Sequence, residues 1–151
     1  MIEGYGNPLQ NQKTRRLLGV VLLVGAVVYL LSANHEGISV AVKADYMSLS
    51  HSSGESFEIR FTDILSVTEI QALDLGNQIS GIETKRCKCG VWSNSQFGEY
   101  NLCIYADVMR YIVVETVNGA SVLNLRGEDE TRSFYIAFCK LLQTKRAEAA
   151  P

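Results

Sequence analysis

The chain has 151 residues, enough for one domain of ordinary size whose core can stand without a metal ion or a disulfide. It carries 14 Lys and Arg residues against 16 Asp and Glu residues, a net charge of −2 at neutral pH. This balance excludes a strongly basic domain, so we expect no nucleic-acid partner.

The N-terminal part of the chain consists of a polar tail, residues 1–16, and an apolar segment, residues 17–34. Between Leu17 and Ala33 the sequence has no charge, no Asn or Gln and no Pro. As a helix these residues would span about 25 Å, close to the hydrocarbon core of a bilayer at roughly 30 Å. We therefore expect a transmembrane helix, anchored by Leu17, Leu18, Val20, Val21, Leu22, Leu23, Val24, Val27, Val28, Tyr29, Leu30 and Leu31.

Two other interpretations of the apolar segment stay open. A cleaved signal peptide would share the basic start and the small residue Ala33, although Leu31 fits poorly at the position three residues before the cut. A buried core helix would need a larger domain around it. For an uncleaved anchor, Lys13, Arg15 and Arg16 keep the N-terminus in the cytoplasm by the positive-inside rule. We expect a single-pass protein of the cell membrane with its domain outside.

Residues 37–144 predict a β domain that ends in one helix. Apolar and polar residues alternate over 38–43 and again over 57–61, and a turn cluster separates them at 51–54. Residues 64–73 predict a third strand. Residues 74–98 have no clear period, and we expect a long irregular connection there.

A strand over 100–105 and a hairpin over 110–125 follow. Asn118-Gly119 is the preferred pair for a two-residue type I′ turn, which would place Val114 opposite Leu123. This pairing predicts one apolar face on the hairpin, formed by Ile112, Val114, Leu123 and Leu125.

The period becomes helical after Gly127. Acidic residues begin the segment and basic residues end it, as the helix dipole favours. We expect the helix to cover the open end of a curled sheet, with residues 145–151 as a C-terminal tail. Its apolar stripe consists of Phe134, Ala137, Phe138, Leu141 and Leu142.

Three stretches together resemble the bacterial pleckstrin-homology-like (PH-like) domains, which are often attached to transmembrane helices. They are FTDILSVTEI (61–70), QFGEYNLCIY (96–105) and RYIVVETVNGASVLNLRGEDETRSFY (110–135), and the resemblance covers roughly 37–143. It implies a PH-like curled sheet or barrel closed by the helix, and the residue patterns predict about six or seven antiparallel strands for it. It also implies a binding or assembly module. Before the 100–105 strand, this chain has KRCKCG where the family has an Arg-x-Asn-Gly-like run.

The cysteines of KRCKCG suggest several kinds of chemistry. Zinc sites use C-x₂₋₄-C with a second ligand pair, whereas Cys87 and Cys89 are one residue apart. A thioredoxin-like pair needs C-x-x-C in a βαβ unit. We therefore expect no metal and no cofactor. If the domain lies outside the cytoplasm, a disulfide between Cys103 and either Cys87 or Cys89 is an open alternative.

The cations of the same stretch suggest an anion-binding or partner-binding loop. It would consist of Lys85, Arg86, Lys88, Trp92 and Phe97. PH domains that bind phosphoinositides place basic residues between their first two strands. We assign that loop to SLSHSSGES (48–56), which has no Lys or Arg, so we do not expect phosphoinositide binding.

No pattern in the chain indicates an enzyme. The carboxylates form no paired motif, and the sequence has neither a nucleophile elbow nor a glycine-rich phosphate loop before a helix. We expect a non-enzymatic, membrane-anchored binding or assembly module whose ligand is a protein partner or the membrane surface. Two alternatives are an exported thiol or metal-binding protein that uses Cys87 and Cys89, and an accessory subunit of a larger membrane complex.

Overall fold

The computed structural model describes residues 37–149, which form two β-sheets and one long helix. The predicted tail 1–16 and the predicted anchor 17–34 lie outside these residues. The strands are β1 (Ile38–Val42), β2 (Tyr46–His51), β3 (Ser56–Arg60), β4 (Ile64–Ile70), β5 (Asn77–Glu83), β6 (Cys87–Asn94), β7 (Gly98–Tyr105), β8 (Tyr111–Thr116) and β9 (Gly119–Leu123). A short 3₁₀ turn, η2 (Phe61–Asp63), joins β3 to β4, and α2 (Glu128–Ala149) is the last described element.

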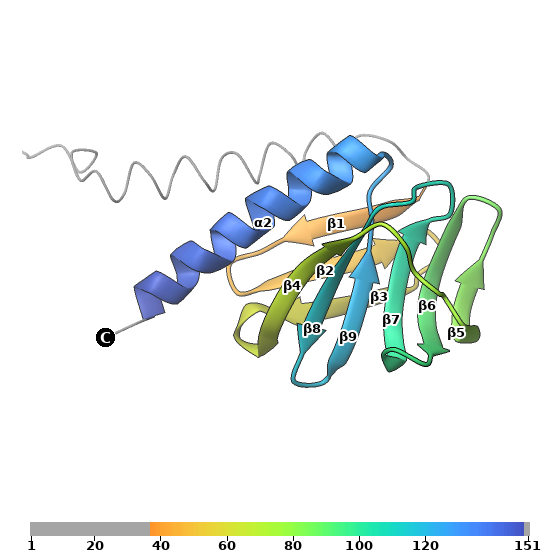
Figure 1. Cartoon of the computed structure of the whole chain (residues 1–151), viewed down its shortest axis with the longest axis horizontal. Coiled ribbons are helices and arrows are strands. Elements are labelled where there is room, and N and C mark those ends of the chain that lie inside the picture. The colour runs from red at the N-terminus through yellow and green to blue at the C-terminus, as the bar shows by residue number, and fades with distance from the viewer. Residues whose placement is uncertain (1–36, 150–151) are drawn as a thin grey trace, which may run out of the picture.

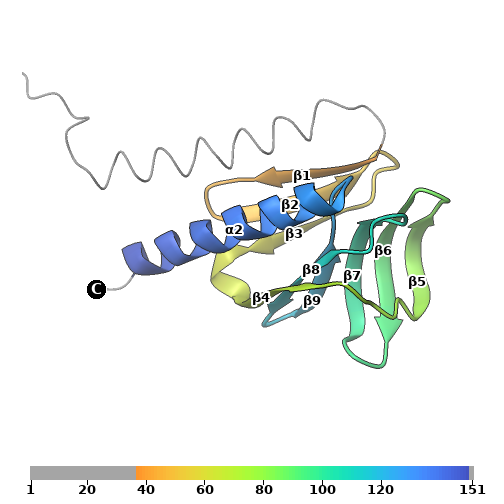
Figure 2. The ribbon, with the colours of Figure 1, turned by 45° about the horizontal axis from the view of Figure 1, so that its top comes forward.

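The strands form two separate layers. One sheet has the order β1-β2-β3 and the other has the order β4-β8-β9-β7-β6-β5. The strands of the small sheet run across those of the large one (Figure 1). Figure 2 shows the two layers from a second side, with α2 running along them.

The prediction of a mainly β domain with one C-terminal helix is confirmed. The predicted count of six or seven strands is wrong, since residues 37–149 contain nine, and the two sheets do not close into a barrel. The expectation of antiparallel pairing fails at one place, because β7 and β9 are parallel. Sequence patterns give which face of a strand is apolar, but not which strand lies beside it.

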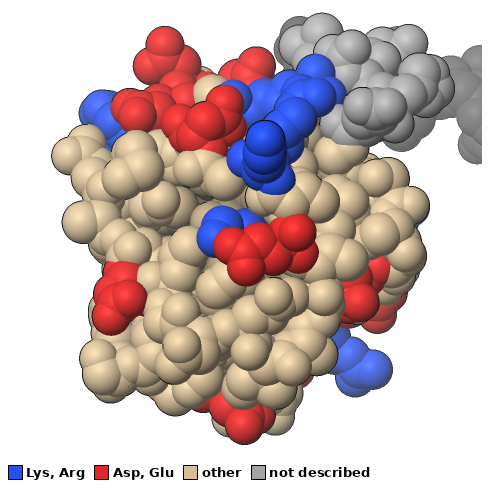
Figure 3. All heavy atoms as spheres, turned by 90° about the vertical axis from the view of Figure 1, so that its right-hand side faces the viewer, with Lys and Arg blue, Asp and Glu red and all other residues tan. Residues whose placement is uncertain are grey.

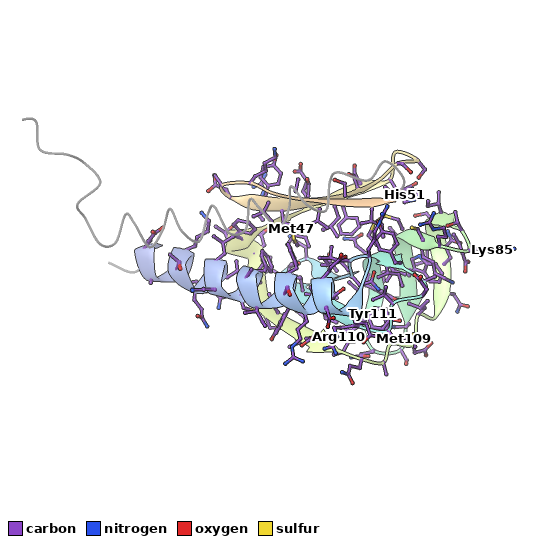
Figure 4. All side chains as sticks on the ribbon, turned by 90° about the horizontal axis from the view of Figure 1, so that it is seen from above. Met47, His51, Lys85, Met109, Arg110 and Tyr111 are labelled. Atoms are coloured by element: carbon purple, nitrogen blue, oxygen red, sulfur yellow. A yellow bond between two sulfur atoms is a disulfide. The ribbon has the colours of Figure 1, made fainter. Side chains whose placement is uncertain are left out.

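The main core lies between the two sheets and is completed by α2. Met47 and Leu49 of β2 are fully buried from one side, and Ile112 and Leu123 from the other. Figure 4 shows Met47 between the small sheet and the helix. The predicted helical stripe is confirmed, because Phe134, Ala137, Phe138, Leu141 and Leu142 are all buried. The helix continues to Ala149, past the expected boundary at 144.

The β8–β9 hairpin is confirmed, but its register is not. Thr116 lies opposite Gly119, and Val114 lies opposite Ser121, so the two-residue turn is Val117-Asn118. A hydroxyl explains the difference: Thr116 Oγ1 accepts from Asn118 N at 3.1 Å and donates to Gly119 O at 2.8 Å. The shift moves each partner by two residues, which keeps every side chain on its predicted face.

The expected irregular connection over 74–98 is wrong, since β5 and β6 form a hairpin there. The two strands approach closely where Gly81 pairs with Gly90, and both glycines have positive φ (101° and 146°). A Cβ on Gly90 would lie 2.6 Å from Gly81 Cα, so this crossing needs glycine. The close approach of β5 and β6 therefore explains the glycine of KRCKCG, Gly90.

The assignment of 48–56 as the first loop is also wrong. Residues 48–51 belong to β2, and the loop between β1 and β2 is Lys43–Asp45. That loop contains a lysine. The expectation against phosphoinositide binding relied on a first loop without Lys or Arg, and it therefore loses this support.

A buried polar cluster connects the end of β9 to β7 and to α2. Asn124 is 0% exposed; it accepts from Tyr105 N at 2.6 Å and donates to Tyr105 O at 3.1 Å and to Val108 O at 3.0 Å. Thr131 Oγ1 accepts from Leu125 N at 3.0 Å and donates to Gly127 O at 2.7 Å. These bonds satisfy backbone groups where the chain leaves the sheet and the helix begins.

Candidate functional site

The five residues of the predicted anion-binding loop do not form one cluster. Lys85 and Arg86 are exposed in the β5–β6 turn, whereas Phe97 lies in the β6–β7 turn at the other end of β6. The eight residues of β6 span about 26 Å at 3.3 Å per residue, so the two turns are far apart.

The other two residues of that set have structural partners. Lys88 pairs with Glu83 across the β5–β6 hairpin, and its Nζ lies 5.2 Å from the ring centre of Trp92. Trp92 is buried among the side chains on the outer face of the large sheet. Only Lys85 and Arg86 of the predicted loop therefore present their charge to solvent.

The exposed cations lie near the point where the described chain begins. Arg86 O accepts from Ala106 N at 2.8 Å, next to Tyr105, and the Tyr105 hydroxyl accepts from Ile38 N at 3.1 Å. Gly37 O accepts from Ser52 N at 3.3 Å. We call this region, Gly37 with Ser52, Arg86 and Tyr105, the Gly37 corner. His51 and Lys85 lie toward this side of the molecule in Figure 4.

The Gly37 corner holds the start of β1 firmly. Gly37 has φ +137°, and a Cβ there would collide with the Tyr105 hydroxyl and lie 3.1 Å from its ring. Tyr105 itself is 6% exposed. The first described residues are therefore fastened to the large sheet as well as to β2.

The charge at this corner is mixed. Lys85, Arg86 and Arg126 share it with Asp107, and the acidic start of α2, Glu128 to Glu130, follows β9 at the same end of the sheet. In Figure 3 the Lys and Arg atoms at the top of this face lie beside a group of Asp and Glu atoms. Such a surface gives no strong preference for an anionic membrane.

Of the two disulfides left open by the sequence, the structure has Cys89–Cys103. The two cysteines lie directly opposite each other on β6 and β7, with their Cα atoms 4.1 Å apart, and both are 0% exposed. Cys87 lies two residues before Cys89 and therefore on the same, inward face. The disulfide is part of the core.

We expect loss of this disulfide to lower the free energy of unfolding by about 3 kcal/mol, because it closes a loop of about 15 residues in the unfolded chain. Since neither sulfur is exposed, the protein should be reduced while unfolded and then refolded with and without reductant, followed by urea unfolding. A Cys89→Ala/Cys103→Ala variant should show no effect of the reductant. Four free thiols in the oxidised, denatured protein, instead of two, would contradict the assignment.

The two free thiols are poor nucleophiles. Burial raises the pKa of Cys87, although the nearby Arg86 charge partly opposes this, and burial also raises the pKa of Cys139. A raised pKa leaves less thiolate at neutral pH. Within residues 37–149, no three His, Cys, Asp or Glu side chains lie close enough together to hold a metal ion.

A second core covers the outer face of the large sheet. The chain between β4 and β5 passes across this face (Figure 1), where Leu73 and Leu75 pack on Trp92 and Tyr100. The Tyr100 hydroxyl donates to Leu75 O at 2.8 Å, and burial, with the nearby Asp74 charge, raises the Tyr100 pKa to about 12. Packing and this hydrogen bond therefore hold the segment between β4 and β5 against the sheet.

We expect the free energy of unfolding to fall as the pH rises above about 10, up to about 12. In that interval the unfolded chain loses the Tyr100 proton while the folded protein keeps it, so the folded state binds more protons and a rising pH favours unfolding. Urea unfolding at several pH values would measure this slope. Tyr100→Phe should make the slope shallower; equal slopes in the two proteins would contradict the assignment, whatever their absolute stabilities.

The outer edge of the large sheet is β5. Its residues are largely exposed and uncharged, and Ile79 is 52% exposed. A partner strand could pair with such an edge, but β5 has a bulge between Gln78 and Ser80 followed by the kink at Gly81. Bulges of this kind hinder edge-to-edge pairing.

A groove lies at the far end of β1 from Gly37, between the small sheet and the last turns of α2. Its volume is about 800 Å³, and it is lined by Asp45, Tyr46, Arg60, Phe61, Thr62, Ile64, Leu142, Lys145, Arg146 and Glu148. This site was not predicted from the sequence. Its residues come from segments some 80 positions apart, and no motif marks them.

Comparisons with protein-family models, with curated proteins and with solved structures found no match to this chain. The helix within residues 37–149 is not apolar enough to cross a bilayer. The expected anchor, residues 17–34, precedes that part of the chain.

Proposed function

We propose that this protein is a non-enzymatic binding module held at the cell membrane by residues 17–34, with its domain outside the cytoplasm. The observation that supports the proposal is that the contacts of the Gly37 corner hold the start of β1, close to the apolar segment. Only His35 and Glu36 separate the apolar segment from Gly37, and Gly37 and Ile38 are fastened to Ser52 and Tyr105. A linker of two or three residues reaches at most about 10 Å. A domain held in this way stays next to the bilayer with a limited range of orientations.

The Cys89–Cys103 disulfide supports the external location, because disulfides persist in oxidising compartments. It weakens the alternative of a thiol or metal protein. With Cys89 bonded to Cys103 and buried, that alternative would rest on Cys87, which is itself buried and has a raised pKa.

We propose that the β8–β9 hairpin and α2 resemble the corresponding part of PH-like domains. This resemblance supports a binding function. There an antiparallel hairpin leads directly into an amphipathic helix that packs on the same sheet. The parallel β7–β9 pair and the separate sheets differ from the barrel that the resemblance implied.

The proposal is tested by the location of the full chain in cells. Val24→Arg/Val27→Arg places two charges in the apolar segment and should move the protein from the alkali-resistant membrane fraction to the soluble or misfolded fractions. Gln10→Arg/Gln12→Arg adds the same charges outside that segment and should leave the protein in the membrane. A reporter after Pro151 should be active only outside the cytoplasm. An alkali-soluble wild-type protein, or a reporter active in the cytoplasm, would contradict the anchor or the orientation respectively.

A further inference from the structure

The groove at the far end of β1 combines an apolar floor with cations at its rim. Phe61, Ile64 and Leu142 line the groove, and each is less than 10% exposed because most of its side chain packs in the main core. A volume of about 800 Å³ falls within the range of roughly 300 to 1,000 Å³ typical of small-molecule sites.

Two of the rim cations are held in place by uncharged partners. Lys145 Nζ lies 5.8 Å from the ring centre of Phe61, and Arg146 Nη2 donates to Ile64 O at 3.0 Å. The third, Arg60, is exposed at the end of β3. Within residues 37–149, none of these three cations lies at ion-pair distance from a carboxylate.

The balance of charge in the groove indicates what kind of anion fits. Asp45 and Glu148 also line it, so three cations face two carboxylates and the net charge is only +1. A small inorganic anion would gain little from that excess in water. An anion with an apolar body would add burial against the floor, worth about 0.8 kcal/mol for each CH₂ group.

The position of the groove argues for a soluble ligand. The groove begins beyond the end of β1, whose five residues span about 17 Å from the Gly37 corner. That distance exceeds the Debye length of roughly 8 Å at physiological salt, so lipid charge at the Gly37 corner would be screened at the groove. This step rests on the proposed anchor and on β1 pointing away from the bilayer; the chemistry of the groove rests on neither.

We propose that the groove binds a soluble organic anion, a phosphate or carboxylate on a short apolar body, with Lys145, Arg146 and Arg60 holding the anion. The apolar body lies against Phe61, Ile64 and Leu142. This ligand class deepens the proposed binding function.

The test is calorimetric titration of the full chain in phosphatidylcholine nanodiscs, with empty discs subtracted, using hexyl phosphate as the probe. Hexyl phosphate should bind saturably at one site. Inorganic phosphate, which has the charge alone, and hexanol, which has the apolar body alone, should each bind at least about tenfold more weakly. Equal binding of hexanol and hexyl phosphate would overturn the role of the cations, and no saturable binding would overturn the site.

Variants locate the site. Lys145→Gln/Arg146→Gln should weaken hexyl phosphate binding at least about tenfold, because two charged donors are lost. Lys140→Gln removes one positive charge from the same helix outside the groove and should change affinity less than about twofold. Unchanged binding in the double variant, or an equal loss in the Lys140 variant, would overturn the proposal.

Two further measurements test the role of the rim cations and the source of the ligand. If the double variant unfolds, Arg60→Gln on β3 replaces it, and unchanged binding there would overturn the role of the rim cations. Competition by phosphatidate placed in the same disc would overturn the soluble source. The failures are distinguishable, since a protein that leaves the membrane but still binds hexyl phosphate contradicts the anchor and not the groove.

Discussion

Replacing Asn124 by Ala is expected to lower the free energy of unfolding by about 4 kcal/mol. The side chain is fully buried and holds three backbone groups, Tyr105 N, Tyr105 O and Val108 O. Alanine would leave these groups without their side-chain partner inside the protein, and each unsatisfied buried group costs about 1–3 kcal/mol. Urea unfolding followed by circular dichroism would measure the loss.

Asn118→Ala is the matched control for this experiment. Asn118 is exposed in the β8–β9 turn, so the same chemical change should cost less than about 1 kcal/mol. A loss below about 1 kcal/mol for Asn124→Ala as well would show that water or a rearranged backbone satisfies the freed groups.

Phe138→Ala is expected to cost about as much, roughly 4 kcal/mol, for a different reason. Phe138 is 1% exposed; its ring centre lies 5.8 Å from that of Phe61 and 5.7 Å from that of Phe134. The substitution removes apolar contacts and leaves a cavity where the helix meets the sheets. Thermal or urea unfolding would measure it.

Ile136 provides the control on the same helix. It is 58% exposed, so Ile136→Ala should change the free energy of unfolding by no more than about 0.5 kcal/mol. Similar losses for Ile136→Ala and Phe138→Ala would mean that the helix packs through a different face.

The local elements of this fold could be predicted where one period was strong. The stripe around Phe134 and Phe138 identified the helix and its buried face, and the β8–β9 hairpin was recognised with the correct faces but the wrong register. β5 gave no such signal, because Ile79 is the one apolar residue between Asn77 and Gly81 and the strand lies at an exposed edge. β2 was missed although Met47 and Leu49 alternate with polar residues, since its last residues, Ser50 and His51, continue directly into the turn cluster.

The arrangement of the elements could not be predicted. β4 pairs with β8, some 45 residues away, and β9 lies between β8 and β7. Packing between residues far apart in the chain determines which strands lie side by side. The groove follows from the same packing, because it exists only where η2 meets the end of α2, and neither segment has a binding motif of its own.

The order of the strands in the large sheet also indicates which parts of the domain can fold first. β6 and β7 are adjacent in the chain, so their hairpin needs only local contacts and can form within microseconds. β9, at the centre of the large sheet, is the last strand to be synthesised. Cys89 and Cys103 therefore come within reach of each other before the central strand arrives, and the disulfide can close during biosynthesis, ahead of the complete sheet.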